Sequence, residues 1–343
     1  MSESFSDVLV AGGGPVGLAA AIEARMRGLS VTVLEPRSDA IDKACGEGLM
    51  PGALPALARL GVDPVGFPLR GVSYRNGRTT ADHLFDTGSG RGVRRTVLHA
   101  ALESQARSLG VSFATARVES VEQDAVGVTV AGMRGRYLLA ADGLHSTVRR
   151  LVGLERPVRA RGRRFGLRRH YFMEPESDLI EVYWTPTVEA YVTPVGDGIV
   201  GIALLGRRGT DFERTLAGIP ALARRVRGRE QASSLRGAGP FRQTTTARTR
   251  GRVMLIGDAS GYVDAITGEG IRVGLAQAEA AIACVEADDA AGYDAAWTAK
   301  TRDFRLLTAG LVAAANSPLR GAIVPAAAAL PRVFGAVVER LAR

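Results

Sequence analysis

The stretch DVLVAGGGPVGLAAAIEARMRGLSVTVLE, residues 7–35, decides the fold of this chain. It opens with a short apolar run at 7–11 whose β-branched residues are typical of a buried parallel strand. The glycine pattern G-x-G-x-x-G follows at 12–17, and a helical pattern extends over 18–27. A second apolar run at 31–34 ends in Glu35. This order predicts a strand, a tight turn, a helix and a second parallel strand.

The glycines and the acid in this unit match the fingerprint of a dinucleotide-binding fold. Gly12 permits the tight turn, Gly14 lets the backbone approach a pyrophosphate, and Gly17 lets helix and strand pack closely. The helix N-terminus offers free N–H groups to phosphates. Glu35 would accept hydrogen bonds from the adenosine ribose and disfavours a 2′-phosphate. The motif predicts a bound adenine dinucleotide, with a ligand-free glycine turn as the alternative, and does not choose between NAD and FAD.

Two later segments favour FAD. Residues 136–143 form an apolar strand ending in Asp-Gly, and residues 252–258 form another ending in Gly-Asp. The second leads to Gly-Glu-Gly-Ile at 268–271 and a long Ala-rich helical pattern at 272–286.

Together these motifs resemble the FAD oxidoreductases of the para-hydroxybenzoate hydroxylase fold. Their pattern A-D-G-x-x-S-x-x-R is met by Ala141, Asp142, Gly143, Ser146 and Arg149. The resemblance implies that Asp258 accepts hydrogen bonds from the ribityl chain, and that the helix after residue 268 aims N–H groups at the flavin. It also implies an α/β fold: a Rossmann-like FAD-binding domain with an inserted antiparallel β-sheet substrate domain and a helical C-terminus.

A narrower resemblance lies at 43–51, KACGEGLMP, which is similar to the segment beside the isoalloxazine ring in geranylgeranyl reductase-like flavoproteins. The GDASG sequence at 257–261 agrees with that subgroup, since aromatic hydroxylases usually read GDAAH there. In the subgroup Arg95 would reach FAD, and Val118, expected at the end of a short strand, matches a backbone contact to the adenine end. The segment also resembles flavin hydroxylases of type III polyketide and phenolic-lipid pathways, so reductase and hydroxylase both stay open.

The motifs and the resemblance place one set of residues at the cofactor. These are Gly12, Gly14, Pro15, Val16, Gly17, Glu35, Arg37, Lys43, Cys45, Gly46, Arg95, Val118, Asp142, Asp258, Gly268, Gly270 and Ile271. No catalytic residue is assigned. Cys45 and Glu47 are weak candidates, whose alternatives are a buried thiol and a surface turn residue. The four histidines show no spacing suited to a metal or a triad, and no metal site is expected.

The middle of the chain reads as successive strands, which predicts the substrate-side sheet. The runs lie at 164–173, 179–184, 189–193 and 199–205, with hairpin signals at 196–198 and at 76–77. Tyr171, Tyr183, Trp184 and Tyr191 are expected to line an apolar pocket or to fill the sheet core. The W-x-W-x-I-P pattern of flavin halogenases is missing near here, so halogenation is not expected.

These elements divide the chain into three expected parts. Residues 1–71, 93–160 and 246–290 form the FAD-binding domain, residues 72–92 and 161–245 form the substrate domain, and residues 291–343 form C-terminal helices. The C-terminal helices are expected to pack against the body, with a cap over a substrate channel or a peripheral membrane contact as alternatives.

Composition bounds the remaining possibilities. Hydrophobic residues make up 46% and charged residues 23%, as in an ordinary globular protein. The net charge is +9, yet the Arg-rich stretch 159–169 lacks interleaved aromatics and any nucleic-acid motif, so nucleic acid is not an expected partner. A start without a signal-peptide pattern, two cysteines and no continuous spanning segment predict a cytoplasmic protein. The oligomeric state is left open.

The leading hypothesis is an FAD-dependent monooxygenase that hydroxylates a hydrophobic aromatic molecule, polyketide- or phenolic-lipid-like, with NAD(P)H and O₂. With no second nucleotide fingerprint in the sequence, NAD(P)H would bind only transiently as the electron donor, or an outside donor would reduce the flavin. The alternative is an FAD-dependent ene-reductase of isoprenoid double bonds. A non-enzymatic FAD-binding protein is disfavoured by the substrate sheet.

Overall fold

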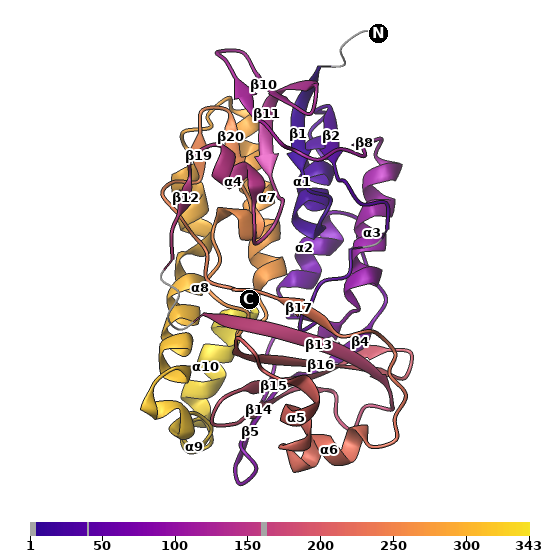
Figure 1. Ribbon diagram of the computed structural model, residues 1–343, viewed down its shortest axis with the longest axis vertical. Coiled ribbons are helices and arrows are strands. Elements are labelled where there is room, and N and C mark those ends of the chain that lie inside the picture. Colours follow the sequence, from indigo (N-terminus) through magenta and orange to yellow (C-terminus); the bar gives the residue numbers. More distant parts are fainter. Residues whose placement is uncertain (1–4, 40, 159–162) are drawn as a thin grey trace.

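The computed structural model describes residues 5–39, 41–158 and 163–343. One β-sheet with its covering helices occupies one end of the elongated molecule, and a second sheet occupies the other (Figure 1). The domain boundary expected at 160–161 and the first residues of the Arg-rich stretch 159–169 lie outside the described residues.

The first sheet is built on the predicted parallel strands, in the order β19-β20-β11-β1-β2-β8. Its strands are β1 (Ser6–Ala11), β2 (Val31–Leu34), β8 (Ser112–Ala114), β11 (Met133–Ala140), β19 (Thr249–Arg250) and β20 (Val253–Leu255). The apolar runs of β1, β2, β11 and β20 pair in parallel and are buried, which confirms the four strands expected from the motifs. Strands β9 (Glu122–Gln123) and β10 (Val128–Val130) extend the sheet beside β11.

Helices cover this sheet and form its main core. They are α1 (Pro15–Met26), α2 (Ala53–Arg59), α3 (Arg95–Ser108) and α7 (Gly270–Glu286). Helix α1 packs against both α3 and α7. Its run of small residues at 19–21 is fully buried, which lets these helices approach closely. The Gly-rich turn is therefore held between β1 and a tightly packed helical layer.

The second sheet has the order β17-β13-β16-β15-β14-β5-β6. Its strands are β5 (Gly71–Arg75), β6 (Thr80–Leu84), β13 (Arg164–Phe172), β14 (Leu179–Trp184), β15 (Glu189–Gly196), β16 (Ile199–Arg207) and β17 (Arg236–Ala238). The predicted hairpins are confirmed: Gly77 has φ 85° between β5 and β6, and Asp197 has φ 53° between β15 and β16. One pairing departs from the expected antiparallel pattern, because β5 joins β14 in parallel. The β5–β6 hairpin comes from a separate part of the chain and adds to the free edge of β14.

Short elements connect the two sheets. Strands β3 (Gly48–Leu49), β4 (Phe67–Leu69) and β7 (Gly90–Gly92) form a small sheet of their own, and β7 contacts β15. Strand β12 (Glu155–Arg156) pairs with β18 (Thr244–Thr245), and α4 (Thr147–Leu151) follows the Asp-Gly motif. Helices α5 (Phe212–Ala217) and α6 (Pro220–Val226) cover one face of the second sheet.

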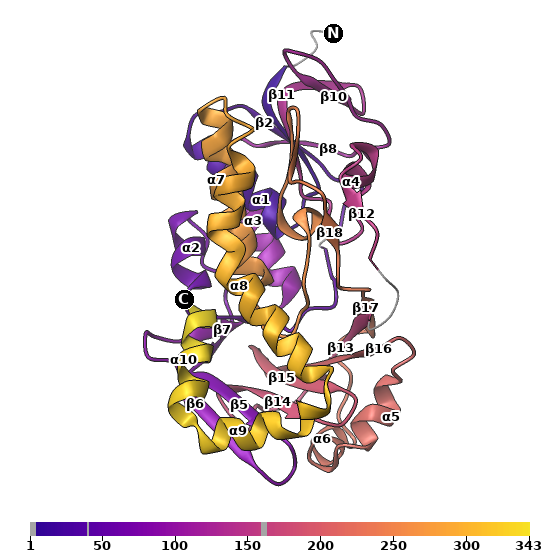
Figure 2. The same ribbon diagram turned by 90° about the vertical axis from the view of Figure 1, so that its left-hand side faces the viewer.

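The C-terminal segment runs from the first sheet to the second (Figure 2). It consists of α8 (Tyr293–Ala315), the short helix η2 (Pro318–Ala322), α9 (Ile323–Ala329) and α10 (Pro331–Ala342). Helix α8 contacts α7, whereas α9 and α10 contact β6. Within the described residues no single helix has the length and apolar composition of a membrane span. The segments Pro318–Ala329 and Pro331–Ala342 reach both criteria only as a pair, bent by 103°.

Candidate active site

The turn after β1 depends on glycine at two positions and leaves open space at a third. Gly12 has φ 108°, and a β-carbon there would lie 2.6 Å from the Ala141 carbonyl oxygen. A β-carbon on Gly17 would lie 1.9 Å from the Gly12 carbonyl oxygen. No atom lies within 4 Å of a β-carbon built on Gly14. The backbone at Gly14 is therefore open to a ligand, as the fingerprint predicts.

Glu35, at the end of β2, is hydrogen-bonded to this turn. Its Oε2 accepts a hydrogen bond of 2.9 Å from the Gly13 N–H, and its Oε1 accepts one of 2.7 Å from Arg37 Nε. Burial raises the pKa of Glu35, but these hydrogen bonds outweigh burial and leave the pKa below its usual value. The side chain is therefore an ionised acceptor suited to hydroxyl groups.

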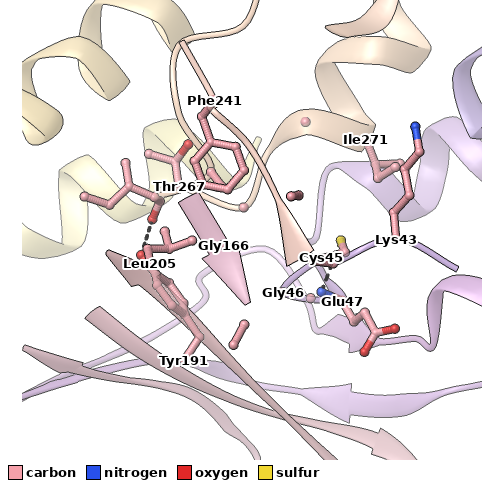
Figure 3. A pocket seen from close by; sticks show the side chains of 18 of the residues that line it. Lys43, Cys45, Gly46, Glu47, Gly166, Tyr191, Leu205, Phe241, Thr267 and Ile271 are labelled. Atoms are coloured by element: carbon pink, nitrogen blue, oxygen red, sulfur yellow. Dashed lines mark hydrogen bonds between the residues drawn. The ribbon is translucent and has the colours of Figure 1, made fainter. Parts of the chain in front are cut away.

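A cavity between the two sheets brings separate parts of the chain together (Figure 3). Its cofactor-side wall contains Gly14, Pro15, Val16, Lys43, Cys45, Gly46, Glu47, Arg95, Gly143, Asp258, Gly268, Gly270 and Ile271. Three sequence motifs thus converge on one space, together with the 43–47 segment and the start of α3. Eleven of these residues belong to the set predicted for the cofactor, while Glu47 is the weak catalytic candidate.

Opposite charges lie close together at the centre of this wall. Burial raises the pKa of Asp258, and the positive charges of Lys43 and Arg95 offset part of that effect. Burial lowers the pKa of Lys43, while Asp258 opposes this. A β-carbon on Gly143 would lie 3.0 Å from Lys43 Nζ, so the Asp-Gly motif and the lysine are neighbours. Asp142, in the same motif, accepts from the Val148 N–H at 3.0 Å through Oδ2. Its buried Oδ1 has no partner among the described residues.

Helix α7 begins at the cavity. Gly268 has φ 71°, and Gly270 is the first helical residue, so the free N–H groups of the first turn lie at the cofactor-side wall. Glu269, just before the helix, is 2% exposed and bonded to Arg272. Burial raises the pKa of Glu269 to about 7, with Arg272 acting in the opposite direction.

Cys45 and Glu47 lie together in the loop before β3. Cys45 Sγ accepts from the Glu47 N–H at 3.4 Å. Burial raises the pKa of the Cys45 thiol, with Arg95 opposing, so the thiol form is favoured over the thiolate. Glu47 has φ 59° and is 5% exposed, which excludes the surface-turn alternative. Its Oε1 accepts from the Arg95 N–H at 2.7 Å.

His170 of β13 is a partner of Glu47 that the sequence did not indicate. Its Nε2 forms a short hydrogen bond with Glu47 Oε2, and its Nδ1 lies 2.9 Å from Ser233 Oγ. Arg168, two residues earlier, lies 3.2 Å from the same Nδ1 and pairs with Asp42. Glu47 and His170 are 123 positions apart, so spacing gave no signal. The signal that the sequence did contain is the row of polar residues at 164, 168 and 170, which alternate along β13 and share its buried face.

The opposite wall of the cavity is apolar. It includes Met50, Val72, Tyr74, Leu167, Ile180, Val182, Tyr191, Leu205, Phe241, Ile266, Val338 and Leu341. Of the four aromatics expected here, Tyr191 lines the cavity and donates to the Ile266 carbonyl at 2.7 Å. Tyr171 and Tyr183 pack on the other face of the sheet, against α5 and α6, and Trp184 packs into the core beside α10. These three residues therefore follow the sheet-core alternative. Tyr171 and Tyr183 face away from the cavity because successive strand residues point to opposite sides of a sheet.

Two further expectations need correction. The C-terminal segment does more than pack against the body, since Val338 and Leu341 of α10 form part of the cavity wall. Val118 does not end a strand, because β8 stops at Ala114; its side chain is 8% exposed and lies in the core beside Leu34. The cofactor contact of Val118 stays a prediction, as do those of Glu35, Arg37 and the other proposed residues.

The comparisons with known proteins agree with this arrangement. The family described as "FAD binding domain" matches residues 6–285. FAD-dependent monooxygenase OpS4 of Beauveria bassiana is 35% identical over 162 residues, which are 41% of this chain and 38% of that protein. Rifampicin monooxygenase of Streptomyces venezuelae is 32% identical over 165 residues, covering 44% of this chain and 34% of that protein. The chain thus spans only about a third of the length of these two monooxygenases.

Other matches extend over most of the chain. Menaquinone reductase of Mycolicibacterium smegmatis is 28% identical over 341 residues, 85% of this chain and 79% of that protein. Among solved structures, p-nitrophenol 4-monooxygenase of Pseudomonas putida has a TM-score of 0.81 at 21% identity, covering 99% of each chain. A geranylgeranyl bacteriochlorophyll reductase-like protein of Thermoplasma acidophilum has a TM-score of 0.76 at 19% identity, covering 98% and 92%. These two structures share the fold.

The chain belongs to the FAD binding domain family. It has the fold of flavin monooxygenases and of the geranylgeranyl reductase-like flavoproteins.

Proposed function

We propose that this protein is an FAD-dependent monooxygenase that hydroxylates a hydrophobic aromatic molecule, using NAD(P)H and O₂. The observation that carries the proposal is one continuous cavity with a cofactor-side wall of Gly-rich and charged residues and an opposite apolar wall. When bound, FAD supplies the electron transfer and the activation of O₂. The chain supplies position, a dry chamber and proton-handling groups.

The chain's residues fit FAD in three respects. The open backbone at Gly14 and the first turn of α1 suit the pyrophosphate. The ionised Glu35 suits the ribose hydroxyls, and the carboxylate of Asp258 suits the ribityl hydroxyls. The free N–H groups at the start of α7 favour negative charge on the nearest edge of the flavin ring. Each assignment is part of the proposal.

The substrate side favours a molecule that is apolar over most of its surface. The hydroxyl of Tyr191 already donates to the Ile266 carbonyl, so it offers little to a ligand. The thiol of Cys45 and the carboxylate of Glu47 lie on the cofactor side of the same cavity. A molecule with one polar end directed toward Glu47 and an apolar remainder under the second sheet would satisfy both walls. An alkylated phenol has this character.

The division into domains is also a proposal. Apart from β7 and β18, the strands within 72–92 and 163–245 belong to the second sheet, whose strand β5 begins at Gly71. Apart from β3, β4 and β12, the strands within 5–71, 93–158 and 246–290 belong to the first sheet, and the helices there pack with it. Residues 291–343 supply α8 to α10. The cavity would then be an interdomain site, as is common for small-molecule ligands.

A second function is an ene-reductase acting on isoprenoid double bonds. Two observations favour it: Cys45 lies in the cavity, and the reductase relatives align over most of their length. Digeranylgeranylglycerophospholipid reductase 1 of Methanothermobacter thermautotrophicus, for example, is matched over 74% of its length at 27% identity. The same apolar wall would hold a polyene chain.

Oxygen consumption separates the two functions. The purified holoenzyme is given NAD(P)H and either alkylphenols of graded chain length or isoprenoid polyenes, in air and under strict anaerobiosis. The proposal predicts hydroxylated phenols formed in step with O₂ uptake, and no product without O₂. Saturated polyenes formed anaerobically would establish the reductase instead and overturn the hydroxylase.

A further inference from the structure

We propose that the outer side of the C-terminal segment docks on a membrane surface that contains anionic lipid. Large apolar side chains are exposed there on successive elements. The exposed fractions are 63% for Leu306 in α8, 68% for Leu319 in η2, 56% for Leu330 between α9 and α10, and 58% for Val333 in α10. These four residues define the docking face. Single exposed apolar residues are common on proteins, whereas a group of them on one segment indicates a binding surface.

The rest of this outer side offers few groups that require water. From 306 to 338 the sequence contains only two charged residues, Arg320 and Arg332. The other exposed residues between 309 and 336 are mostly alanine, glycine and proline. A helix whose outer side faces water usually carries charged and polar residues there. The composition of this surface therefore favours contact with an apolar medium.

An ion pair joins the two helices that carry much of the docking face. Arg340 of α10 pairs with Asp303 of α8. Leu306 lies one turn after Asp303, and Val333 lies two turns before Arg340, so both apolar residues share the helix side of the ion pair. Figures 1 and 2 place α8, α9 and α10 together along one side of the molecule. The exposed apolar residues thus belong to one surface.

The charges around the docking face match an anionic partner. Residues 304–343 contain five arginines and one acid, and that acid, Glu339, is 5% exposed and hydrogen-bonded to His83. Arg302 and Arg332 are exposed beside the apolar residues of α8 and α10. Anionic lipid headgroups attract arginines at a membrane surface. A second copy of this chain would instead place arginines opposite arginines, so charge favours lipid over self-association.

One helix, α10, contributes both to the docking face and to the wall of the cavity. Val338 and Leu341 line the cavity, whereas Val333 is exposed on another side of the same helix. A hydrophobic molecule dissolved in the lipid would therefore be held close to the apolar wall of the cavity. This link to the substrate rests on the proposed function, whereas the contact with lipid does not.

Vesicle binding tests the docking face without any substrate. The purified FAD-loaded protein is mixed with vesicles of phosphatidylcholine alone, or of equal parts phosphatidylcholine and phosphatidylglycerol, and the bound fraction is measured by flotation. We expect binding to the mixed vesicles, and binding at least about tenfold weaker to phosphatidylcholine alone. Added salt should weaken the first and change the second little. A parent protein that binds neither kind of vesicle would overturn the proposal.

Three variants identify the surface that binds. Val333→Glu and Leu306→Glu place an acid on the docking face from two different helices, and each should weaken binding to the mixed vesicles at least about tenfold. Val126→Glu is the matched control, because it makes the same change of charge at a valine that is 64% exposed between β9 and β10. It should bind as the parent does.

Flavin content and thermal denaturation check that the variants fold. Val333 lies in the first turn of α10, where a negative charge is favourable to the helix, so Val333→Glu should remain folded. Equal binding by Val333→Glu and Val126→Glu would overturn the proposal. So would a parent dimer that Val333→Glu dissociates while vesicles stay unbound, since a second copy would then be the occupant. Because no substrate is present, these results are independent of whether the proposed hydroxylation is found.

Discussion

Gly274 of α7 lies directly against Val16 of α1, and a β-carbon on Gly274 would lie 2.3 Å from Val16 Cγ2. Val16 also lines the cavity next to the Gly-rich turn. The absence of a side chain at 274 therefore sets how closely the two helices that flank the cofactor-side wall approach.

We expect Gly274→Ala to lower the free energy of unfolding by about 1–3 kcal/mol, because a methyl group there overpacks a closed contact. It should also weaken FAD binding, since α1 and α7 both contribute N–H groups to the site. Thermal denaturation and flavin titration measure the two effects. Gly310→Ala in α8 is the control, because no atom lies within 4 Å of a β-carbon built on Gly310. This change should raise the free energy of unfolding by about 0.5–1 kcal/mol. Equal effects at both positions would contradict this.

Asp258→Ala should yield folded protein with little bound FAD, because the carboxylate proposed for the ribityl hydroxyls is removed. The ratio of flavin to protein absorbance after purification measures this loss. Asp63→Ala, at an exposed carboxylate paired with Arg91, should retain the parent's flavin content. If Asp258→Ala kept its flavin, the ribityl assignment would be withdrawn.

Glu269 makes the stability of the protein depend on pH. Burial raises its pKa from 4.5 to about 7 in the folded chain, so the folded state binds more protons than the unfolded state between these values. Stability is therefore fully present below pH 4.5 and falls as the pH rises through 7, by about 3 kcal/mol from this group.

Glu269→Gln should remove that loss. Urea denaturation should show that the free energy of unfolding falls less between pH 5 and pH 8 in the variant than in the parent. Glu286→Gln, on the exposed side of α7, should keep the parent's drop. Identical drops in Glu269→Gln and the parent would show that the carboxyl is ionised at pH 5.

Val338 and Val337 are adjacent in α10 but face different surroundings: Val338 lines the cavity, and Val337 is 40% exposed. Val338→Phe should fill part of the chamber and raise KM for the bulkiest substrates at least about tenfold, with less effect on small ones. Val337→Phe should leave KM unchanged. Steady-state kinetics over substrates of graded size distinguish a steric effect from a general loss of activity.

The parts of the fold that local chemistry determines were predictable from the sequence. The turn at Gly12, the parallel strands and the hairpin at Asp197 follow from glycine conformations and apolar runs within a few residues. The parallel pairing of β5 with β14 was not predictable, because it joins segments more than a hundred positions apart at a free sheet edge.

The part of the candidate site that is built from local motifs was also predictable from the sequence. The cofactor-side wall consists largely of motif residues, and the structure brings them together. The contact between Glu47 and His170 escaped prediction because Glu47 lies in the loop before β3 and His170 lies in β13, 123 positions later. The place of α10 in the cavity wall also depends on packing that a helical pattern does not specify.

A cavity wall formed partly by a helix affects how substrate selectivity can change among related proteins. The backbone of α10 satisfies its own hydrogen bonds, so inward residues such as Val338 and Leu341 are replaceable one at a time without disturbing any strand ladder. Residues of the second sheet are more constrained, because their side chains also pack against side chains of the neighbouring strands on the same face. We therefore expect related proteins that accept differently shaped molecules to differ first along α10.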